Sequence, residues 1–522
     1  MANIPLDMEQ IARVKQYAGE IADQVQNLIQ QNSSVCVERA ILRLYGVDGV
    51  NESKTPLPNR LVEILQENGS LPSGVSRAFA AAMLESGRDP QTTAELIEQG
   101  KIDFGKTDTG KFSPGAIREK ESELAKNAVD TLDKSRKNKK EKQEQFSVPP
   151  QPWRYMIVAT GNIYEDRTQA AAAAMAGSDI IAVIRSTAQS LLDYVPYGAT
   201  TEGFGGTFAT QENFAIMRKA LDKASEENKR YIRLVNYASG LCMAEIAACA
   251  AIEDLDMLLN DSMYGILFRD INMKRTFIDQ YFSRLICSRA KIIINTGEDN
   301  YLTTFDAVES AYTVTASQLI NEAMGKNALL TDDLLGLGHA FEINPKKENA
   351  FLMELAHAQL ARQLFPDAPL KYMPPTKYKK TDIFYSHCMD TMFNLASVTT
   401  GQGIHLAGIL TEAIHTPLMQ DRFQALSGID YVFNIAKDLG SEIEFKKEGV
   451  IAKRAQQVLN EAEAFLADLK EGGLMSGISA GKFADIKRTE EGGKGLTGVF
   501  EKDPAYSNPI MALLEEEGVI HD

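Results

Sequence analysis

Short apolar runs rich in β-branched residues alternate with segments of helical spacing through the middle of the chain. The runs are Tyr155–Ala159, Ile180–Ile184, Ile232–Val235, Met257–Leu259, Ile292–Ile294, a weak one at Leu370–Met373, and Gly403–Leu406. The helical stretches between them include Thr168–Met175, Asn213–Ala224, Met243–Asp254, Lys274–Ser288, Val308–Met324, Glu348–Leu364 and Ile383–Val398. Alternation of this kind indicates a parallel sheet covered by helices.

The number of repeats favours an α/β fold of the TIM (β/α)8 barrel type. A barrel requires eight strand–helix repeats, and the apolar runs supply seven of them. We expect the remaining strand near Ala328–Phe341, where the letters GLGHAF follow an apolar stretch. A doubly wound open sheet is the alternative, because periodicity alone does not distinguish the two arrangements.

The segments on either side of this alternation are predicted to be helical. We expect an N-terminal helical accessory region over 1–150, a barrel over 151–425 and a C-terminal helical accessory region over 426–522. The first boundary lies at SVPPQPW (Ser147–Trp153), whose prolines end a helix. The preceding stretch Arg118–Gln145 interleaves acids and bases, which favours a solvated helix over a nucleic-acid-binding arm.

Composition excludes several classes of protein. The net charge of -16 argues against nucleic acid as a partner, since phosphate binding requires a basic face. No run approaches the ~20 apolar residues that span a bilayer, and the N-terminus has no apolar signal core, so we expect a cytoplasmic protein with no membrane contact. The five cysteines are scattered, which predicts reduced, buried thiols and no metal site.

Polar residues follow several of the predicted strands, at the edge where a barrel carries its active site. Several such clusters at one level favour a pocket over ordinary polar loops. The clusters are Arg185, Ser186 and Ser190; Asn236 and Ser239; Asn260, Asp261, Ser262 and Tyr264; Asn295, Glu298, Asp299 and Asn300; and Lys371.

The segment Arg185–Thr210 is long for a loop between a strand and a helix. Arg185 supplies a planar charge suited to phosphate, hydroxyls such as that of Ser190 can donate to phosphate oxygens, and its glycines allow close backbone approach. The alternative is a surface loop with an incidental arginine. The glycine spacing does not match GxGxxG, which excludes a Rossmann phosphate loop here.

Three further side chains suit an amino-acid ligand. Tyr264 can stack on a planar ring, although an aromatic residue this close to a strand is more often part of the core. Asp299 and Lys371 offer opposite charges for a zwitterion, or form a structural ion pair with each other. The sequence around Lys371 gives no sign of a lysine that forms a Schiff base.

At these residues the chain resembles the large (alpha) subunit family of lysine 5,6-aminomutase, and the resemblance covers essentially the whole sequence. Its most specific parts are IRSTAQSLLDYVPYGATTEGFGGTFATQENF, LVNYASGLCMAEIA, NDSMYGILFRDINMKRTFIDQYFSR and INTGEDNYLTT. The resemblance implies an isomerase of lysine fermentation that uses pyridoxal 5′-phosphate and adenosylcobalamin. In such an enzyme the terminal amino group of D-lysine or L-β-lysine migrates from carbon 6 to carbon 5 by radical chemistry.

The resemblance also implies roles for individual residues. Arg185 and Ser190 would bind the cofactor phosphate, Ser239 would face the pyridine nitrogen, and Tyr264 would stack on the ring. Asp299 and Lys371 would hold the amino and carboxylate groups of the substrate. The weaker candidates are Tyr194, Arg269 and Asn300 near the same head group, and Glu412 on the adenosyl side.

Finally, the resemblance implies a partner. The family's Schiff-base lysine and its cobalamin domain, which holds the cobalt, lie on a small (beta) subunit, so an α2β2 assembly is expected. None of the six histidines has Asp two residues before it, so the chain lacks the DxHxxG motif of such a cobalamin domain. Ending at Asp522 without that domain favours lysine over the related ornithine 4,5-aminomutase. The remaining alternative is a non-catalytic scaffold that docks a cobalamin-binding subunit.

Overall fold

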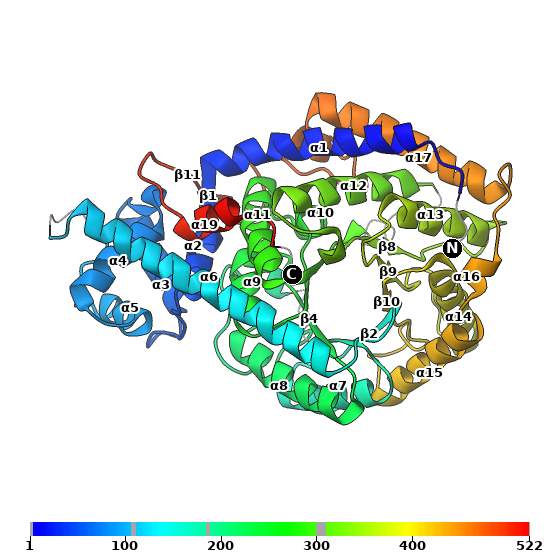
Figure 1. Cartoon of the computed structure of the whole chain (residues 1–522), viewed down its shortest axis with the longest axis horizontal. Helices are drawn as coiled ribbons and strands as arrows, with labels where there is room; N and C mark the ends of the chain where they lie inside the picture. Colours follow the sequence, from blue (N-terminus) through cyan, green and yellow to red (C-terminus); the bar gives the residue numbers. More distant parts are fainter. Residues whose placement is uncertain (1–3, 106–110, 184–187, 299–308, 521–522) are drawn as a thin grey trace.

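A ring of parallel strands forms the centre of the molecule (Figure 1). The structure is a computed structural model that describes residues 4–105, 111–183, 188–298 and 309–520. The ring strands are β2 (Trp153–Ile157), β3 (Ile180–Ala182), β4 (Arg233–Tyr237), β5 (Met257–Leu259), β6 (Ile293–Asn295), β7 (Leu335–Gly336), β8 (Gly338–Ala340), β9 (Lys371–Met373) and β10 (Ile404–Leu406).

Strands β7 and β8 together close the ring, each by pairing with a different end of the sheet. Strand β7 pairs with β6, and β8 pairs with β9. Because Leu337 alone separates these two strands, they form one interrupted strand that joins the two ends of the sheet. The eighth strand predicted within Ala328–Phe341 is therefore confirmed, and the open-sheet alternative is wrong.

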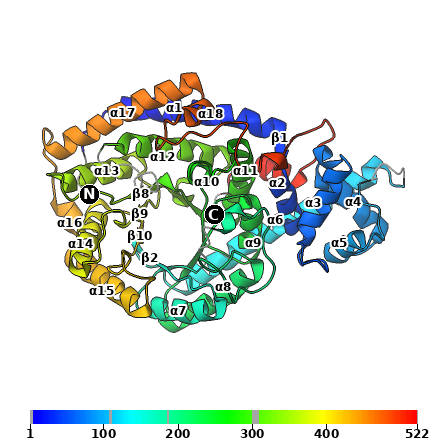
Figure 2. The ribbon, with the colours of Figure 1, turned by 180° about the vertical axis from the view of Figure 1, so that it is seen from behind.

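Helices cover the outside of the ring, as Figures 1 and 2 show from opposite sides. They are α7 (Ile163–Met175), α8 (Gln211–Asn228), α9 (Met243–Ile252), α10 (Ser262–Arg269), α11 (Met273–Ala290), α12 (Ala311–Asn327), α13 (Ala350–Leu364), α14 (Ile383–Thr400) and α15 (Met419–Ile435). The inside is filled by alternate strand residues, among them Tyr155, Ile180, Val235, Met257 and Ile404. The barrel is thus a packed core with its polar groups at the strand ends.

Hydrogen bonding, rather than apolar character, sets where the strands begin and end. Strand β2 starts at Trp153, two residues before the predicted run, because the Trp153 amide donates to the Gly403 carbonyl at 2.8 Å. Its second residue is Arg154, whose guanidinium pairs with Asp179 at 3.1 Å. Strand β4 similarly extends to Tyr237, beyond the apolar run Ile232–Val235. A sequence pattern that scores only apolar residues misses these polar strand positions.

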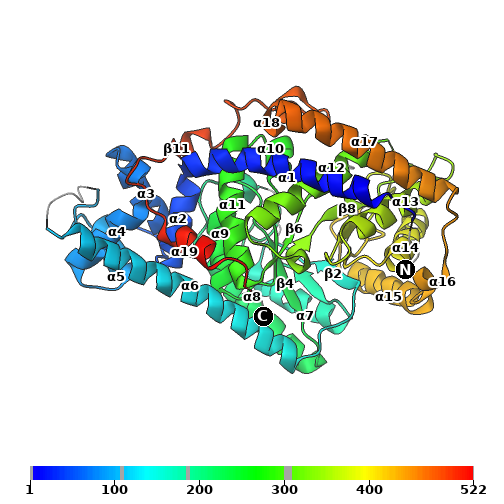
Figure 3. The ribbon, with the colours of Figure 1, turned by 45° about the horizontal axis from the view of Figure 1, so that its top comes forward.

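Segments from both ends of the chain lie against the barrel. Helices α1 and α17 lie side by side across α12 and α13, as Figures 1 and 3 show. Strand β1 pairs antiparallel with β11, which joins the two terminal segments. The N-terminal elements are α1 (Met8–Gln31), β1 (Asn32–Ser34), α2 (Val35–Leu44), α3 (Leu57–Glu67), α4 (Val75–Ser86), α5 (Pro90–Glu98) and α6 (Pro114–Gln145). The C-terminal elements are α16 (Leu439–Glu442), α17 (Val450–Gly472), α18 (Leu474–Ala480), β11 (Val499–Glu501) and α19 (Pro509–Glu517).

Helix α6, which contains the mixed-charge stretch, crosses α9 and α11 on the outside of the barrel. The Lys139 ammonium is buried and donates to the carbonyls of Leu255 (2.8 Å) and Lys291 (3.2 Å). Burial lowers the pKa of Lys139 to about 8. Lys142 pairs with Asp222 at 2.7 Å. These two lysines therefore bind the barrel instead of facing an external anion.

Four of the five cysteines are buried as predicted. Cys388 on α14 is exposed, so the expectation of buried thiols is wrong for this residue. Within the described ranges, every helix is too short or too polar to cross a bilayer.

Three neutral histidines are buried where β8 and β10 meet α13 and α14. His339 stacks on Tyr372 with ring centroids 4.3 Å apart, and His405 stacks on Phe393 at the same distance. His357 lies edge-on to His339 at 5.8 Å. Burial lowers the pKa of these imidazoles to about 4 for His339 and about 3 for His357 and His405. Folding therefore requires all three side chains to remain uncharged.

We predict that stability falls as the pH drops through the range between these depressed pKa values and the ordinary value near 6.5. In this range the unfolded chain binds a proton at each of these histidines and the folded chain does not. Each histidine therefore makes the loss of stability with falling pH steeper. Replacing His405 with Leu should reduce the slope between pH 5 and 6 by about 1 kcal/mol per pH unit. Urea unfolding at the two pH values measures this slope.

Glu354 provides a control of opposite sign. Burial raises the pKa of Glu354, which accepts a hydrogen bond from the Tyr372 hydroxyl at 2.6 Å, to about 8. Its protonated form thus contributes stability that is lost as the pH rises toward 8. In a Glu354→Gln variant the loss of stability between about pH 5 and 8 should disappear, so the net slope between pH 5 and 6 should become steeper by about 1 kcal/mol per pH unit, whereas His405→Leu makes it shallower. An unchanged acid slope in His405→Leu would contradict the burial of a neutral imidazole.

Candidate active site

The predicted site residues that the structure describes are distributed over five strand–helix units of the barrel. Ser190 lies in the short 3-10 helix η2 (Gln189–Leu191) after β3, and Ser239 follows β4. Tyr264 lies on α10 after β5, Lys371 is the first residue of β9, and Glu412 follows β10. Arg185, Asp299 and Asn300 lie outside the described residues.

The loops that carry Ser190 and Ser239 lie in direct contact. The Leu241 amide donates to the Ser190 carbonyl at 3.0 Å. Gly240, with φ +127°, approaches so closely that a Cβ atom there would lie 2.6 Å from the Ser190 Cα and carbonyl oxygen. Only glycine fits this contact, which brings two serines from different loops together.

Ser239 is 7% exposed, and its hydroxyl makes no hydrogen bond to any residue that the structure describes. Ser190 has the same small exposed fraction. Buried hydroxyls normally find a partner, because an unsatisfied polar group costs free energy. The Ser239 hydroxyl is therefore suited to a polar atom of a ligand.

Tyr264 is presented by the first turn of α10, which contacts η2. The Asp261 side chain caps this helix and accepts from the amides of Met263 (3.2 Å) and Tyr264 (3.1 Å). Arg269 donates to the Tyr264 hydroxyl at 2.5 Å and lies 5.1 Å from the ring centroid. The half-buried Tyr264 ring thus lies on a helix beside η2, which carries Ser190, and the Arg269 cation contacts the ring.

Lys371 is 6% exposed and lies on the inner face of the barrel. Its neighbour Tyr372 packs outward against Phe393, and the alternation of strand residues places Lys371 on the opposite face. Its register partner is Ile404, an interior residue. A cation at the start of β9 therefore lies deep in the barrel.

Two predicted residues lie in different surroundings. Glu412 forms an ion pair with Lys379 at 3.4 Å, and that buried lysine also pairs with Asp390 at 2.9 Å. Burial raises the pKa of Asp390 to about 6, although Lys379 opposes the shift. The Tyr194 side chain is exposed beyond η2. Within the described ranges, neither Glu412 nor Tyr194 forms a hydrogen bond with Ser190 or Ser239.

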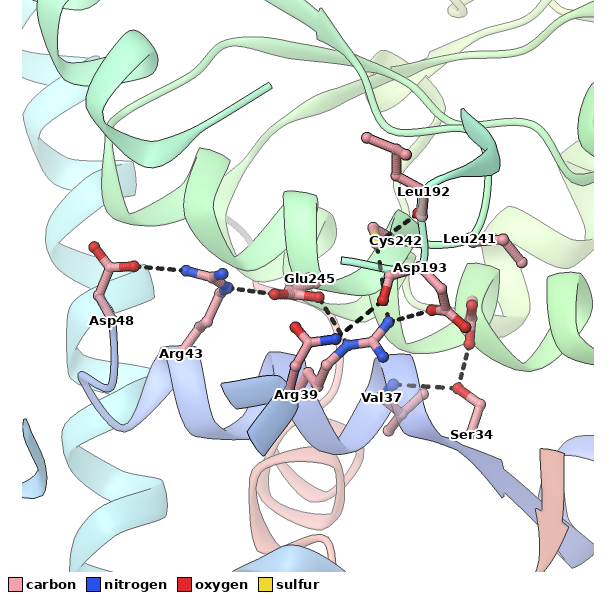
Figure 4. Close-up of polar contacts among 12 residues, drawn as sticks. Ser34, Val37, Arg39, Arg43, Asp48, Leu192, Asp193, Leu241, Cys242 and Glu245 are labelled. Atoms are coloured by element: carbon pink, nitrogen blue, oxygen red, sulfur yellow. Dashed lines mark hydrogen bonds and ion pairs between the residues drawn. The ribbon is translucent and has the colours of Figure 1, made fainter. Parts of the chain in front are cut away.

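Sequence reasoning missed the charged residues behind η2, which Figure 4 shows. Asp193, three residues after Ser190, pairs with Arg39 of α2 at 2.5 Å and with Arg275 of α11 at 2.8 Å. One signal was available: Arg39 and Arg43 lie four residues apart in VCVERAILRL, where charges interrupt an otherwise apolar helix. The pattern indicates buried partners, but it does not say which acids they are.

Comparison with known proteins identifies the family. The sequence model of a protein family, described as the D-lysine 5,6-aminomutase TIM-barrel domain of the alpha subunit, matches residues 4–513. The chain belongs to this family. Aminomutases are isomerases, and the alpha-subunit name implies an enzyme built from more than one kind of subunit. The barrel predicted from the strand pattern agrees with the family's description.

Curated members of the lysine 5,6-aminomutase family match almost the whole chain. The alpha subunit of Fusobacterium nucleatum subsp. nucleatum is 52% identical over 515 residues, which cover 98% of this chain and 99% of the relative. The alpha subunit of Acetoanaerobium sticklandii is 50% identical over 513 residues, 98% of each chain. The D-ornithine 4,5-aminomutase subunit beta of the same organism is 26% identical and covers 70% of this chain and 51% of its own length. The ornithine alternative is therefore not favoured.

We predict that Gly240→Ala lowers the free energy of unfolding by about 2 kcal/mol more than Gly205→Ala does, because the added Cβ collides with Ser190. Gly205 is the matched control, since it also has a positive φ (+75°) but no heavy atom within 4 Å of an added Cβ. Urea unfolding of both variants measures the difference. Equal losses would contradict the close approach of the two serine loops.

Proposed function

We propose that the chain is the large subunit of a lysine 5,6-aminomutase that moves the terminal amino group of D-lysine or L-β-lysine from carbon 6 to carbon 5. The observation that carries this proposal is the identity of 50% or more to two lysine 5,6-aminomutase alpha subunits over 98% of the chain. The arrangement of Ser190, Ser239 and Tyr264 at the strand ends supports it. We place the reaction in the cytoplasm, as part of lysine fermentation.

Pyridoxal 5′-phosphate fits the described residues. Ser190 and Ser239 are buried on two loops that contact each other, and Tyr264 lies on a helix that contacts η2, which carries Ser190. Ser190 would hold the phosphate, together with Arg185 of the preceding segment. Tyr264 would stack on the ring, and its contact with Arg269 would fix the plane of that stack. When bound, the cofactor supplies a conjugated ring that stabilises an adjacent radical.

The Ser239 hydroxyl would face the pyridine nitrogen. A hydroxyl can share a hydrogen bond with this nitrogen without protonating it, whereas a carboxylate would favour the protonated ring. The choice of serine therefore limits how strongly the ring withdraws electrons and avoids an over-stabilised radical. The absence of a competing protein hydrogen bond among the described residues leaves the Ser239 hydroxyl available for this contact.

The substrate would lie between the cofactor and the barrel interior. Lys371, buried on the inner face of the barrel, would hold the substrate carboxylate. Asp299 would hold an amino group, and Asn300, Tyr194 and Arg269 would lie near the same head group. Packed barrel residues such as Tyr155 and Val235 would exclude water beneath the site.

A small partner subunit would complete the enzyme in an α2β2 assembly. It would carry the lysine that forms the Schiff base and bind adenosylcobalamin, which supplies the radical that takes hydrogen from carbon 5. The chain itself lacks the DxHxxG motif of the cobalamin domain. Glu412, which follows β10 and is partly exposed, would face the adenosyl group.

Reconstitution tests the proposed function. The chain is mixed with its small partner subunit, pyridoxal 5′-phosphate and adenosylcobalamin, and the rearranged diamino acid is measured by chromatography. We predict turnover of D-lysine or L-β-lysine only when both chains and both cofactors are present. Mixtures that lack one component are the controls. Turnover by this chain alone, or faster turnover of ornithine than of lysine, would contradict the proposal.

A further inference from the structure

Two arginines of α2 share one buried acid of the barrel. Arg39 and Arg43 donate to the two carboxylate oxygens of Glu245 on α9, at 2.9 and 2.7 Å (Figure 4). The Glu245 side chain is fully buried, and both arginine side chains are exposed by less than 5%. Beyond this shared acid they diverge: Arg39 continues to Asp193 at 2.5 Å, and Arg43 continues to Asp48 at 2.9 Å.

A second cation also binds Asp193 and shares one of its oxygens with Arg39. The fully buried Arg275 of α11 donates to Asp193 at 2.8 and 3.2 Å and to Asp279 at 2.8 Å. The same guanidinium donates to the Leu241 carbonyl at 2.7 Å and to the Gly495 carbonyl at 3.2 Å. One side chain therefore bonds both loops of the serine pair, through Asp193 on one and Leu241 on the other.

The two residues that accept these hydrogen bonds, Asp193 and Leu241, are close in sequence to the two serines. Asp193 follows Ser190 by three residues, and Leu241 follows Ser239 by two. The Asn59 amide donates to the Asp193 carbonyl at 3.0 Å, and the Cys242 thiol donates to the Leu192 carbonyl at 3.3 Å. With so few residues between, a shift of Asp193 relative to Leu241 changes the distance between the two hydroxyls.

Asp193 remains charged between Arg39 and Arg275 over the physiological pH range. Burial alone would raise the pKa of Asp193, but Arg39 and Arg275 outweigh it and hold the pKa well below its usual range. The planar guanidinium fork suits such a shared acid better than an ammonium would. Charge-assisted hydrogen bonds in buried surroundings are also the stronger class.

We propose that Arg39 and Arg275 are positioning residues for the Ser190 and Ser239 pair, acting through Asp193 and the Leu241 carbonyl. This inference rests on the proposed function, in which that pair holds the phosphate and the pyridine nitrogen of pyridoxal 5′-phosphate. The two hydroxyls then contact two different groups of one ligand, the phosphate and the ring nitrogen, so their separation determines whether both contacts form together.

Arg43 is the matched control for Arg39. The two lie one turn apart on α2, are equally buried and share the acceptor Glu245. A loss that came only from an unpaired Glu245 or a loosened α2 would be the same for both. A loss that came through Asp193 would follow Arg39 alone.

The experiment compares Arg39→Gln with Arg43→Gln, each assembled with the small partner subunit. Titration with pyridoxal 5′-phosphate gives the dissociation constant, and amide hydrogen exchange of segment 188–194 is followed in the full chain without cofactor. We predict that Arg39→Gln raises the dissociation constant about tenfold, the equivalent of one charged hydrogen bond, and speeds exchange in this segment. Arg43→Gln should change both by less than about twofold, which is under about 0.4 kcal/mol.

Equal effects of the two variants on both measurements would overturn the inference. If Arg39→Gln does not fold, Asp193→Asn replaces it, because the Asp193 side chain is 39% exposed and asparagine keeps its size while removing its charge. Unchanged affinity and unchanged exchange in Asp193→Asn would then overturn the inference. If the unmodified assembly binds no pyridoxal 5′-phosphate, the proposed function fails, and the exchange comparison alone decides the positioning role: faster exchange in Arg39→Gln than in Arg43→Gln supports it, and equal exchange overturns it.

Discussion

The buried guanidinium of Arg275 holds together the parts from which the candidate site is built. It bonds Asp193 after β3, the Leu241 carbonyl after β4 and the Gly495 carbonyl near the C-terminus. Removing a cation from water is costly, and this cost is offset only because two carboxylates and two carbonyls surround it. Breaking a buried pair of this kind typically costs about 3–5 kcal/mol. The loops can keep one arrangement only while the whole set is present.

This constraint gives the terminal segments a role beyond covering the barrel. The barrel strands are two to five residues long, so they end before they can position side chains that lie several residues further on. Helix α2 supplies Arg39, and Ser34 at its start bonds Asp279, the partner of Arg275. The C-terminal segment supplies the Gly495 carbonyl, and its strand β11 pairs with β1. The site is therefore fixed from outside the barrel as well as from its strand ends.

The sequence predicted the barrel well because the fold depends on local patterns. The strand at Met257–Leu259 has its predicted bounds, and the unusual interrupted strand falls inside the stretch where the eighth repeat was expected. Polar strand residues such as Arg154 and Asn236 were missed, since hydrogen bonding across the sheet includes them. The contact between the Ser190 and Ser239 loops joins residues about 50 positions apart in the sequence. Arg39 and Asp193, which form an ion pair, are 154 positions apart. No local pattern specifies such pairs, and the cofactors entered only through the family resemblance.

The most direct measurement is an experimental structure of the complete enzyme with pyridoxal 5′-phosphate bound. We expect the phosphate within hydrogen-bonding distance of the Ser190 hydroxyl, the pyridine nitrogen facing Ser239, and the ring lying against Tyr264. Asp193 should still be held between Arg39 and Arg275 behind the phosphate. A cofactor bound elsewhere in the barrel, or a site in which Asp193 has left both arginines, would contradict the arrangement described above.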